Sequence, residues 1–113
     1  MKHKDSKVYL QDIYEIIERI EDYTKNRNRD QFLDDYEKQD AIIRRLEIIG
    51  EAVKRVSVKI KENNPDIPWR QMSGMIDVLV HEYAGVNMGR VWDTVKKDIP
   101  RLKKQILKLL KSE

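Results

Sequence analysis

The residue best suited to proton transfer in this 113-residue sequence is His81. It follows the apolar run Val78-Leu79-Val80 and precedes Glu82 and Tyr83, at the end of a segment with helical periodicity. An imidazole titrates near neutral pH and can serve as a general acid or base. The tyrosine hydroxyl two residues on can donate or accept a hydrogen bond, or be modified. From spacing alone, a single histidine near an apolar helix is more often a hydrogen-bonded structural residue.

Composition excludes several other kinds of chemistry. The sequence has no cysteine, so disulfides, thiolate metal ligands and cysteine nucleophiles are ruled out. The second histidine, His3, lies in a polar terminus. Asp77, His81 and Glu82 do not form a recognised metal-ligand set, and no glycine-rich phosphate loop or Ser/His/Asp signature is present. We therefore expect neither a metal nor a cofactor.

The first half of the chain has the periodicity of two amphipathic helices. Apolar side chains recur every three or four residues from Leu10 to Ile20, and a longer series runs from Phe32 to Ile60. The sequence Asn63-Asn64-Pro65 ends the longer series. We predict one helix over about residues 5–25 and a single long helix over about residues 30–62.

The second half, which carries His81, shows the same periodicity. A third helix is predicted over about residues 69–83, followed by a break over 84–89, where Gly85 suits a helix end. Residues 91–97 predict a short helix or turn. Asp98 is a suitable cap for a last helix, with Pro100 in its first turn.

Short connections between long amphipathic helices favour an all-α fold, an up-and-down antiparallel bundle of four to five helices. No repeat or linker divides the sequence, so we expect a single domain over residues 1–113. The large side chains of Trp69, Trp92, Met72 and Met75 are expected in the core or an interface.

The charge pattern gives limited information about partners. The net charge is +3, no apolar run approaches the roughly 20 residues of a membrane span, and the N-terminus lacks an apolar signal segment. We expect a cytoplasmic protein without membrane contact. Residues 96–111 are strongly basic. They predict a solvated helix face with cations near a helix C-terminus, or a surface that contacts an RNA backbone.

Several blocks of sequence occur in a characteristic order. They are Arg44-Arg45-Leu46-Glu47-Ile48-Ile49-Gly50-Glu51-Ala52, Ile67-Pro68-Trp69-Arg70-Gln71-Met72-Ser73-Gly74-Met75, Leu79-Val80-His81-Glu82-Tyr83, Val91-Trp92 and Pro100-Arg101-Leu102. Together these blocks resemble the HepT-like branch of the HEPN superfamily, over about residues 8–110. The third block matches the end of that family's signature, Arg-x4-His-x-Tyr.

The resemblance implies a homodimeric, metal-independent endoribonuclease that is the toxin of a type II toxin–antitoxin pair. RNA supplies its own nucleophile, the 2′-hydroxyl, while His81 would move the proton and a guanidinium would stabilise charge on the phosphoryl oxygens. The products would be a 2′,3′-cyclic phosphate and a 5′-hydroxyl. A nucleotidyltransferase-type antitoxin is the implied partner. In some members it adds AMP to the signature tyrosine, here Tyr83, and the added negative charge would repel RNA.

One position departs from the signature. The family arginine should lie five residues before His81, where this sequence has Ile76. An isoleucine cannot bind a phosphate, and loss of one such donor lowers the rate roughly 10²–10³-fold in other enzymes. Ala84 and Asn87 also stand where the family usually has an aromatic residue and an aspartate. These departures weaken the prediction of activity.

Three explanations fit the departure. Arg70 or Arg90 replaces the missing cation, from the same chain or the second subunit; the chain is an inactive homologue that binds the antitoxin or a nucleotide; or Ile76 is an inactivating change. Residues five apart on a helix point about 140° apart, so position 76 and His81 should not share a face. We expect a cleft shared between two subunits to complete the site. A structural adaptor with a buried His81 is the remaining interpretation.

Overall fold

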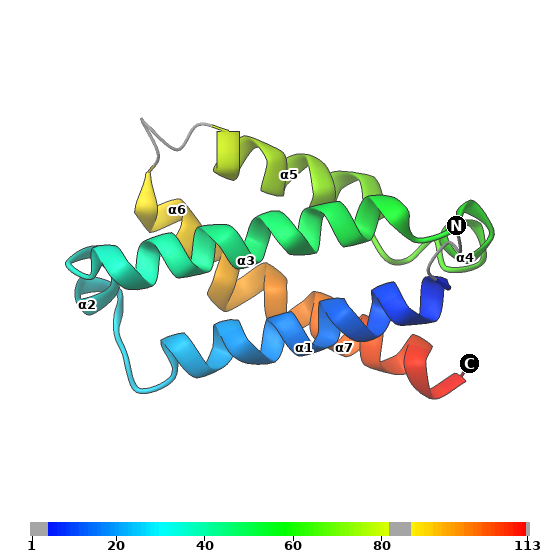
Figure 1. Ribbon diagram of the computed structural model, residues 1–113, viewed down its shortest axis with the longest axis horizontal. Coiled ribbons are helices and arrows are strands. Elements are labelled where there is room, and N and C mark those ends of the chain that lie inside the picture. Colours follow the sequence, from blue (N-terminus) through cyan, green and yellow to red (C-terminus); the bar gives the residue numbers. More distant parts are fainter. Residues whose placement is uncertain (1–4, 82–86, 113) are drawn as a thin grey trace.

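The computed structural model describes residues 5–81 and 87–112, and nearly all of these residues are helical (Figure 1). No strand occurs within those two ranges. The helices are α1 (Ser6–Thr24), α2 (Arg29–Leu33), α3 (Tyr36–Arg55), α4 (Val58–Asn63), α5 (Trp69–His81), α6 (Met88–Asp93) and α7 (Ile99–Ser112), with a π-helical turn, η2 (Thr94–Asp98), between the last two.

The long helices α1, α3, α5 and α7 form an antiparallel bundle. Helix α3 packs against both α1 and α5, and α7 packs against α1. Helices α1 and α5 run in one direction and α3 and α7 in the other, while α2 and α4 lie at opposite ends of the bundle (Figure 1). The predicted all-α, up-and-down bundle is therefore confirmed.

Helix α1 forms where its apolar series predicts. The carboxylate of Asp5 accepts a hydrogen bond from the backbone N–H of Lys7 and caps the first turn, as short polar side chains commonly do. Leu10 and Ile20, the first and last residues of the apolar series, are both fully buried. At the far end, the hydroxyl of Thr24 donates to the carbonyl of Ile20. The prediction of a helix over 5–25 is confirmed.

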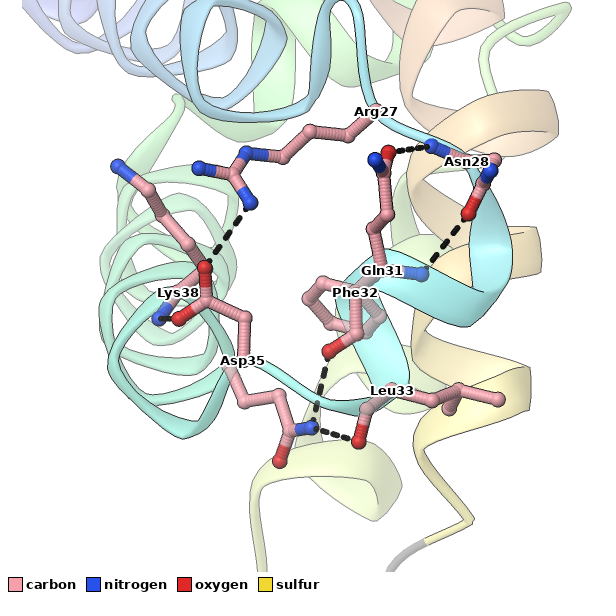
Figure 2. Close-up of polar contacts among 8 residues, drawn as sticks. Arg27, Asn28, Gln31, Phe32, Leu33, Asp35 and Lys38 are labelled. Carbon is pink, nitrogen blue, oxygen red and sulfur yellow. Dashed lines mark hydrogen bonds and ion pairs between the residues drawn. The ribbon is translucent and has the colours of Figure 1, made fainter.

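The prediction of one helix over residues 30–62 is wrong, because within that range the helix ends twice and a new, capped helix begins each time. The first break lies between α2 and α3 (Figure 2). Asp35 accepts a hydrogen bond from the N–H of Lys38 and starts α3. The buried amide of Gln39 donates to the carbonyls of Phe32 and Leu33 at the end of α2. Side-chain groups that bind local backbone compete with helix continuation, which the apolar periodicity does not reveal.

The second break separates α3 from α4. Val56 has extended backbone, and the hydroxyl of Ser57 accepts from the N–H of Ile60 to cap α4. The N–H of Ser57 donates to the hydroxyl of Ser6, 51 residues away. Val56 is buried although its backbone is not helical. The series of apolar residues therefore runs on across a turn, where it no longer indicates a helix.

The C-terminal part of the chain departs from prediction at two points. Helix α6 begins at Met88, inside the predicted break, because the Asn87 side chain accepts from the N–H groups of Gly89 and Arg90. Asp98 is not a cap, since it lies within η2 and the chain continues directly into α7. The N–H of Ile99 donates to Thr94, five residues back. Pro100 has no N–H and its ring would clash with the carbonyl four residues earlier, and the wider π turn accommodates it.

The core is one continuous cluster of aliphatic and aromatic side chains from every long helix. Trp69, Met72 and Trp92 are buried, and Met75 is partly buried against the same cluster, which confirms their predicted packing role. The Phe32 and Trp92 rings pack 5.3 Å apart between centroids. Among the described residues, no helix has the length and apolar character needed to cross a bilayer.

Candidate functional site

His81 is the last residue of α5, and its side chain is exposed. The burial of His81 that the structural-adaptor interpretation assumed is therefore wrong. Ile76 lies on the same helix but is only 1% exposed. This agrees with the expected separation of about 140° between positions five apart on a helix. Within one chain, the structure does not bring position 76 and His81 together on a common face.

Ile76 belongs to the contact between α5 and α3. A Cβ added to Gly50 of α3 would lie 2.9 Å from Cγ2 of Ile76, closer than two carbon atoms can approach without strain. Helices α3 and α5 therefore contact each other at Gly50, and the Ile76 side chain occupies the space that a larger residue at position 50 would need. A guanidinium confined to this space would lose its hydration without a partner, at considerable cost. Isoleucine is consequently the better core residue at this position.

The side of α5 that carries His81 is exposed along the length of the helix. Arg70, Gln71, Gly74, Val78 and His81 are all exposed and fall within about 100° of one another around the helix. We call these five residues the open face of α5. Val78 is 45% exposed, and a Cβ added to Gly74 would meet nothing within 4 Å. The open face thus has a small apolar centre, formed by Gly74 and Val78, with polar side chains at both ends.

Arg70 cannot assist His81 within one chain. The two residues are eleven positions apart on α5, which corresponds to about 16 Å along the helix axis. The structure therefore places this predicted substitute cation on the same face as His81 but at the opposite end of the helix.

An ion pair fixes α5 beside α3 next to the open face. Nζ of Lys54 lies 2.9 Å from a carboxylate oxygen of Asp77 and 3.6 Å from one of Glu51. The hydrogen bond to Asp77 raises the pKa of Lys54 above its ordinary value of 10.5. Asp77 is one turn before His81, so its charge is already engaged with a lysine.

Two further arginines lie on α6 and on α2, which contacts α6. Arg90, the other predicted cation, is exposed on α6. The guanidinium of Arg29, from α2, occupies the place where a Cβ on Gly89 would be, beside the side-chain oxygen of Asn87. Arg29 could not be predicted from the sequence, because a contact between residues sixty positions apart leaves no periodic signal.

The predictions for Tyr83, Glu82 and Ala84 lie outside the described residues. No group of three or more His, Asp or Glu side chains that could hold a metal occurs in the described ranges. A separate groove of about 410 Å³ runs between α1 and α3, away from His81. Apolar and oppositely charged side chains line it, namely Tyr9, Asp12, Glu15, Ile16, Arg19, Arg45, Ile48, Glu51, Ala52 and Arg55.

Comparison with known proteins defines the family. The family model described as "Ribonuclease HepT-like" matches residues 13–109. The chain is 50% identical over 109 residues to "Probable ribonuclease HepT" of Thermococcus cleftensis, which covers 96% of both chains. It is 40% identical over 111 residues to "Putative RNase MJ1216" of Methanocaldococcus jannaschii, covering 98% of this chain and 92% of that protein.

A third relative is longer than this chain. "Gamma-glutamylcyclotransferase and putative RNase MJ0434" of M. jannaschii is 49% identical over 107 residues, which is 95% of this chain and 48% of that protein. The chain therefore spans about half the length of that relative. No solved structure matches. With an all-α bundle and a family model that covers most of its length, the chain belongs to the ribonuclease HepT-like family.

Proposed function

We propose that this chain is the cytoplasmic ribonuclease toxin of a type II toxin–antitoxin pair and cleaves RNA without a metal ion, with His81 as general acid–base. Membership of the ribonuclease HepT-like family supports the reaction class. The observation that carries the role of His81 is its exposure at the end of α5, where a substrate can reach the imidazole.

The proposed reaction is an internal displacement at phosphorus. The imidazole of His81 takes the proton from a ribose 2′-hydroxyl while the oxygen attacks the adjacent phosphorus. The bond from phosphorus to the 5′-oxygen breaks, and a protonated imidazole gives that oxygen a proton. The products are a 2′,3′-cyclic phosphate and a 5′-hydroxyl. Negative charge develops on the phosphoryl oxygens, so the reaction gains from a nearby guanidinium.

A homodimer built on the open face of α5 would supply that guanidinium. In an antiparallel pairing about a two-fold axis beside position 76, Val78 of one subunit fills the space over Gly74 of the other, and the contact occurs twice. The same axis sets Gln71 opposite His81. Measured along the helix axis, Arg70 of the partner subunit then differs in height from His81 by about one residue's rise, 1.5 Å. Arg70 in trans would then take the role of the missing motif arginine.

A second candidate function is a non-catalytic dimer that binds a nucleotidyltransferase antitoxin or a nucleotide. The burial of Ile76 against Gly50 favours it, because the motif position serves packing in this chain. In either case we propose a nucleotidyltransferase-type antitoxin as partner, with AMP addition to Tyr83 as the means of control. Mass spectrometry of the chain after co-expression with that partner tests the modification, and an unmodified Tyr83 contradicts it.

The experiment that separates the two functions is cleavage of a labelled RNA in the presence of a chelator. The wild-type chain is compared with His81→Ala and Ile76→Arg. Cleavage by the wild type and its loss in His81→Ala support the toxin, and 2′,3′-cyclic phosphate ends support the mechanism. Cleavage by Ile76→Arg alone makes the chain an inactivated ribonuclease. If none of the three cleaves although all fold, the binding function is the better account.

A further inference from the structure

Helix α7 carries a row of cations on its outer side. Arg101, Lys104, Lys108 and Lys111 are all exposed, and their spacing of three, four and three residues keeps them within about 80° around the helix. The row extends over ten residues, or about 15 Å. We call these four residues the α7 row. The helix has no acidic residue between Ile99 and Ser112, so the row has a single sign of charge.

Other lysines on the same part of the chain are engaged in the fold. Lys103 lies 2.6 Å from a carboxylate oxygen of Glu21 and over the ring of Tyr14. Lys96 lies over the ring of Trp92. By contrast, within residues 5–81 and 87–112 no member of the α7 row forms an ion pair. The row does not hold the bundle together, and its charge is available to a partner.

The distribution differs from that on the other long helices. On α3, Arg44 pairs with Glu47, and Lys54 lies near both Glu51 and Asp77. Interspersed charges of this kind are the ordinary composition of a solvated helix. An unpaired row of four cations is instead the electrostatic footprint of a polyanion-binding surface.

A small pocket beside the α7 row offers a polar group as well. It has a volume of about 170 Å³ and is lined by residues that include Lys108, Gln105 and Asn64. Gln105 donates from Nε2 to the carbonyl of Asp66, while its Oε1 atom is buried and has no hydrogen-bond partner. Buried acceptors are normally paired. A ribose hydroxyl or a base amine at this pocket would provide the missing donor.

We propose that the α7 row binds the phosphate backbone of single-stranded RNA, with the Gln105 pocket taking a sugar or base edge. The choice of RNA rests on the proposed ribonuclease function. A membrane surface fits less well, because a helix that binds at a bilayer inserts its apolar face, and on α7 the apolar residues Leu102, Ile106 and Leu109 are buried in the bundle. Helices α5 and α7 lie at opposite edges of the bundle in Figure 1, so this surface contributes affinity rather than chemistry.

Binding is measured with an RNA oligomer that carries 2′-O-methyl groups throughout and therefore cannot be cleaved. The variant Lys104→Gln/Lys108→Gln is compared with Lys25→Gln/Lys59→Gln, which removes the same charge from exposed lysines elsewhere. We expect the α7 variant to bind about tenfold more weakly and the control to bind like the wild type. With four contacts to a single strand, the slope of log affinity against log salt should be near −3 for the wild type and about 1.4 shallower for the α7 variant.

Equal binding by the two variants overturns the proposal, whatever the result of cleavage assays with unmodified RNA. Loss of binding in the α7 variant supports it even if the wild type cleaves nothing, so the two proposals fail separately. Sedimentation with anionic phosphatidylserine vesicles tests the other polyanion. If the vesicles bind the chain through the α7 row and the RNA oligomer does not, the surface is a membrane site and the RNA proposal is wrong.

Discussion

Ile76 of α5 lies directly over Gly50 of α3, with its Cγ2 atom 2.9 Å from the place a Cβ on that glycine would take. Both residues are buried. Position 76, where the sequence resemblance leads us to expect an arginine, is thus part of a helix–helix contact in this chain. In the proposed ribonuclease, a change at position 76 would therefore affect both the site and the packing of α5 against α3.

Substitution of Gly50 tests this contact. Gly50→Ala gains up to about 1 kcal/mol of helix propensity but forces a methyl group into Ile76, and overpacking costs about 1–3 kcal/mol. We expect a net loss of about 1 kcal/mol in the free energy of unfolding by urea. In Gly50→Ala/Ile76→Ala the new methyl group enters the cavity, so the double variant should be more stable than the sum of the single effects predicts. Strict additivity would show that the two side chains do not meet.

Gly74 is the matched control on the opposite side of α5. A Cβ there meets nothing within 4 Å, so Gly74→Ala should stabilise an isolated subunit by about 0.5–1 kcal/mol. In the proposed dimer this position receives Val78 of the second subunit. Gly74→Lys should therefore leave the fold intact but give a monomer in sedimentation equilibrium, whereas the wild type gives a dimer. A wild-type monomer at all concentrations, or a dimer of Gly74→Lys, contradicts the proposed interface.

Mixed dimers test whether Arg70 acts across the two-fold axis. Arg70→Ala and His81→Ala should each lower RNA cleavage, the former by about 10²-fold or more. When the two variants are co-expressed, one site of the mixed dimer combines an intact His81 with an intact Arg70 of the partner subunit. We expect cleavage to return in that mixture. If each variant stays inactive in the mixture, Arg70 does not act in trans, and Arg90 and Arg29 become the cations to test.

The lysine pairs make a prediction about alkaline pH. Hydrogen bonds to Asp77 and Glu21 raise the pKa values of Lys54 and Lys103, respectively, above 10.5 in the folded chain. A raised folded pKa contributes stability that is fully present below pH 10.5 and is lost as the pH rises through the folded value. Unfolding followed by circular dichroism should show a steeper loss of stability above pH 10.5 for the wild type than for Lys54→Gln/Lys103→Gln. Parallel curves would show that neither pair favours the charged lysine.

Apolar periodicity predicted the bundle well because each long helix buries one continuous stripe. It could not find the breaks at Asp35 and Ser57, since a polar residue in a long helical pattern looks the same whether it faces solvent or caps a new helix. The hydrogen bonds that cap α3 and α4 distinguish the two cases, in which Asp35 accepts from the N–H of Lys38 and Ser57 accepts from the N–H of Ile60.

The candidate site was predictable only in part. His81 stands out by residue type, and its angular separation from position 76 follows from helix geometry alone. The contact of Ile76 with Gly50 and that of Arg29 with Gly89 join residues far apart in the sequence. Such contacts depend on how the helices pack, which a single sequence does not specify.

The π turn at Thr94–Asp98 makes this chain sensitive to changes in its length. The extra residue in the turn lets Val95, within it, and Ile99, directly after it, both be buried. Deletion of one residue there would rotate everything downstream by about 100°, turning Leu102 and Ile106 toward water and lysines toward the bundle. Point substitutions on the outer face of α7 should leave the fold intact, whereas the deletion of a single residue in this turn should disrupt it. Among related chains, we expect the spacing between Trp92 and Leu102 to be nearly invariant even where the residues between them differ.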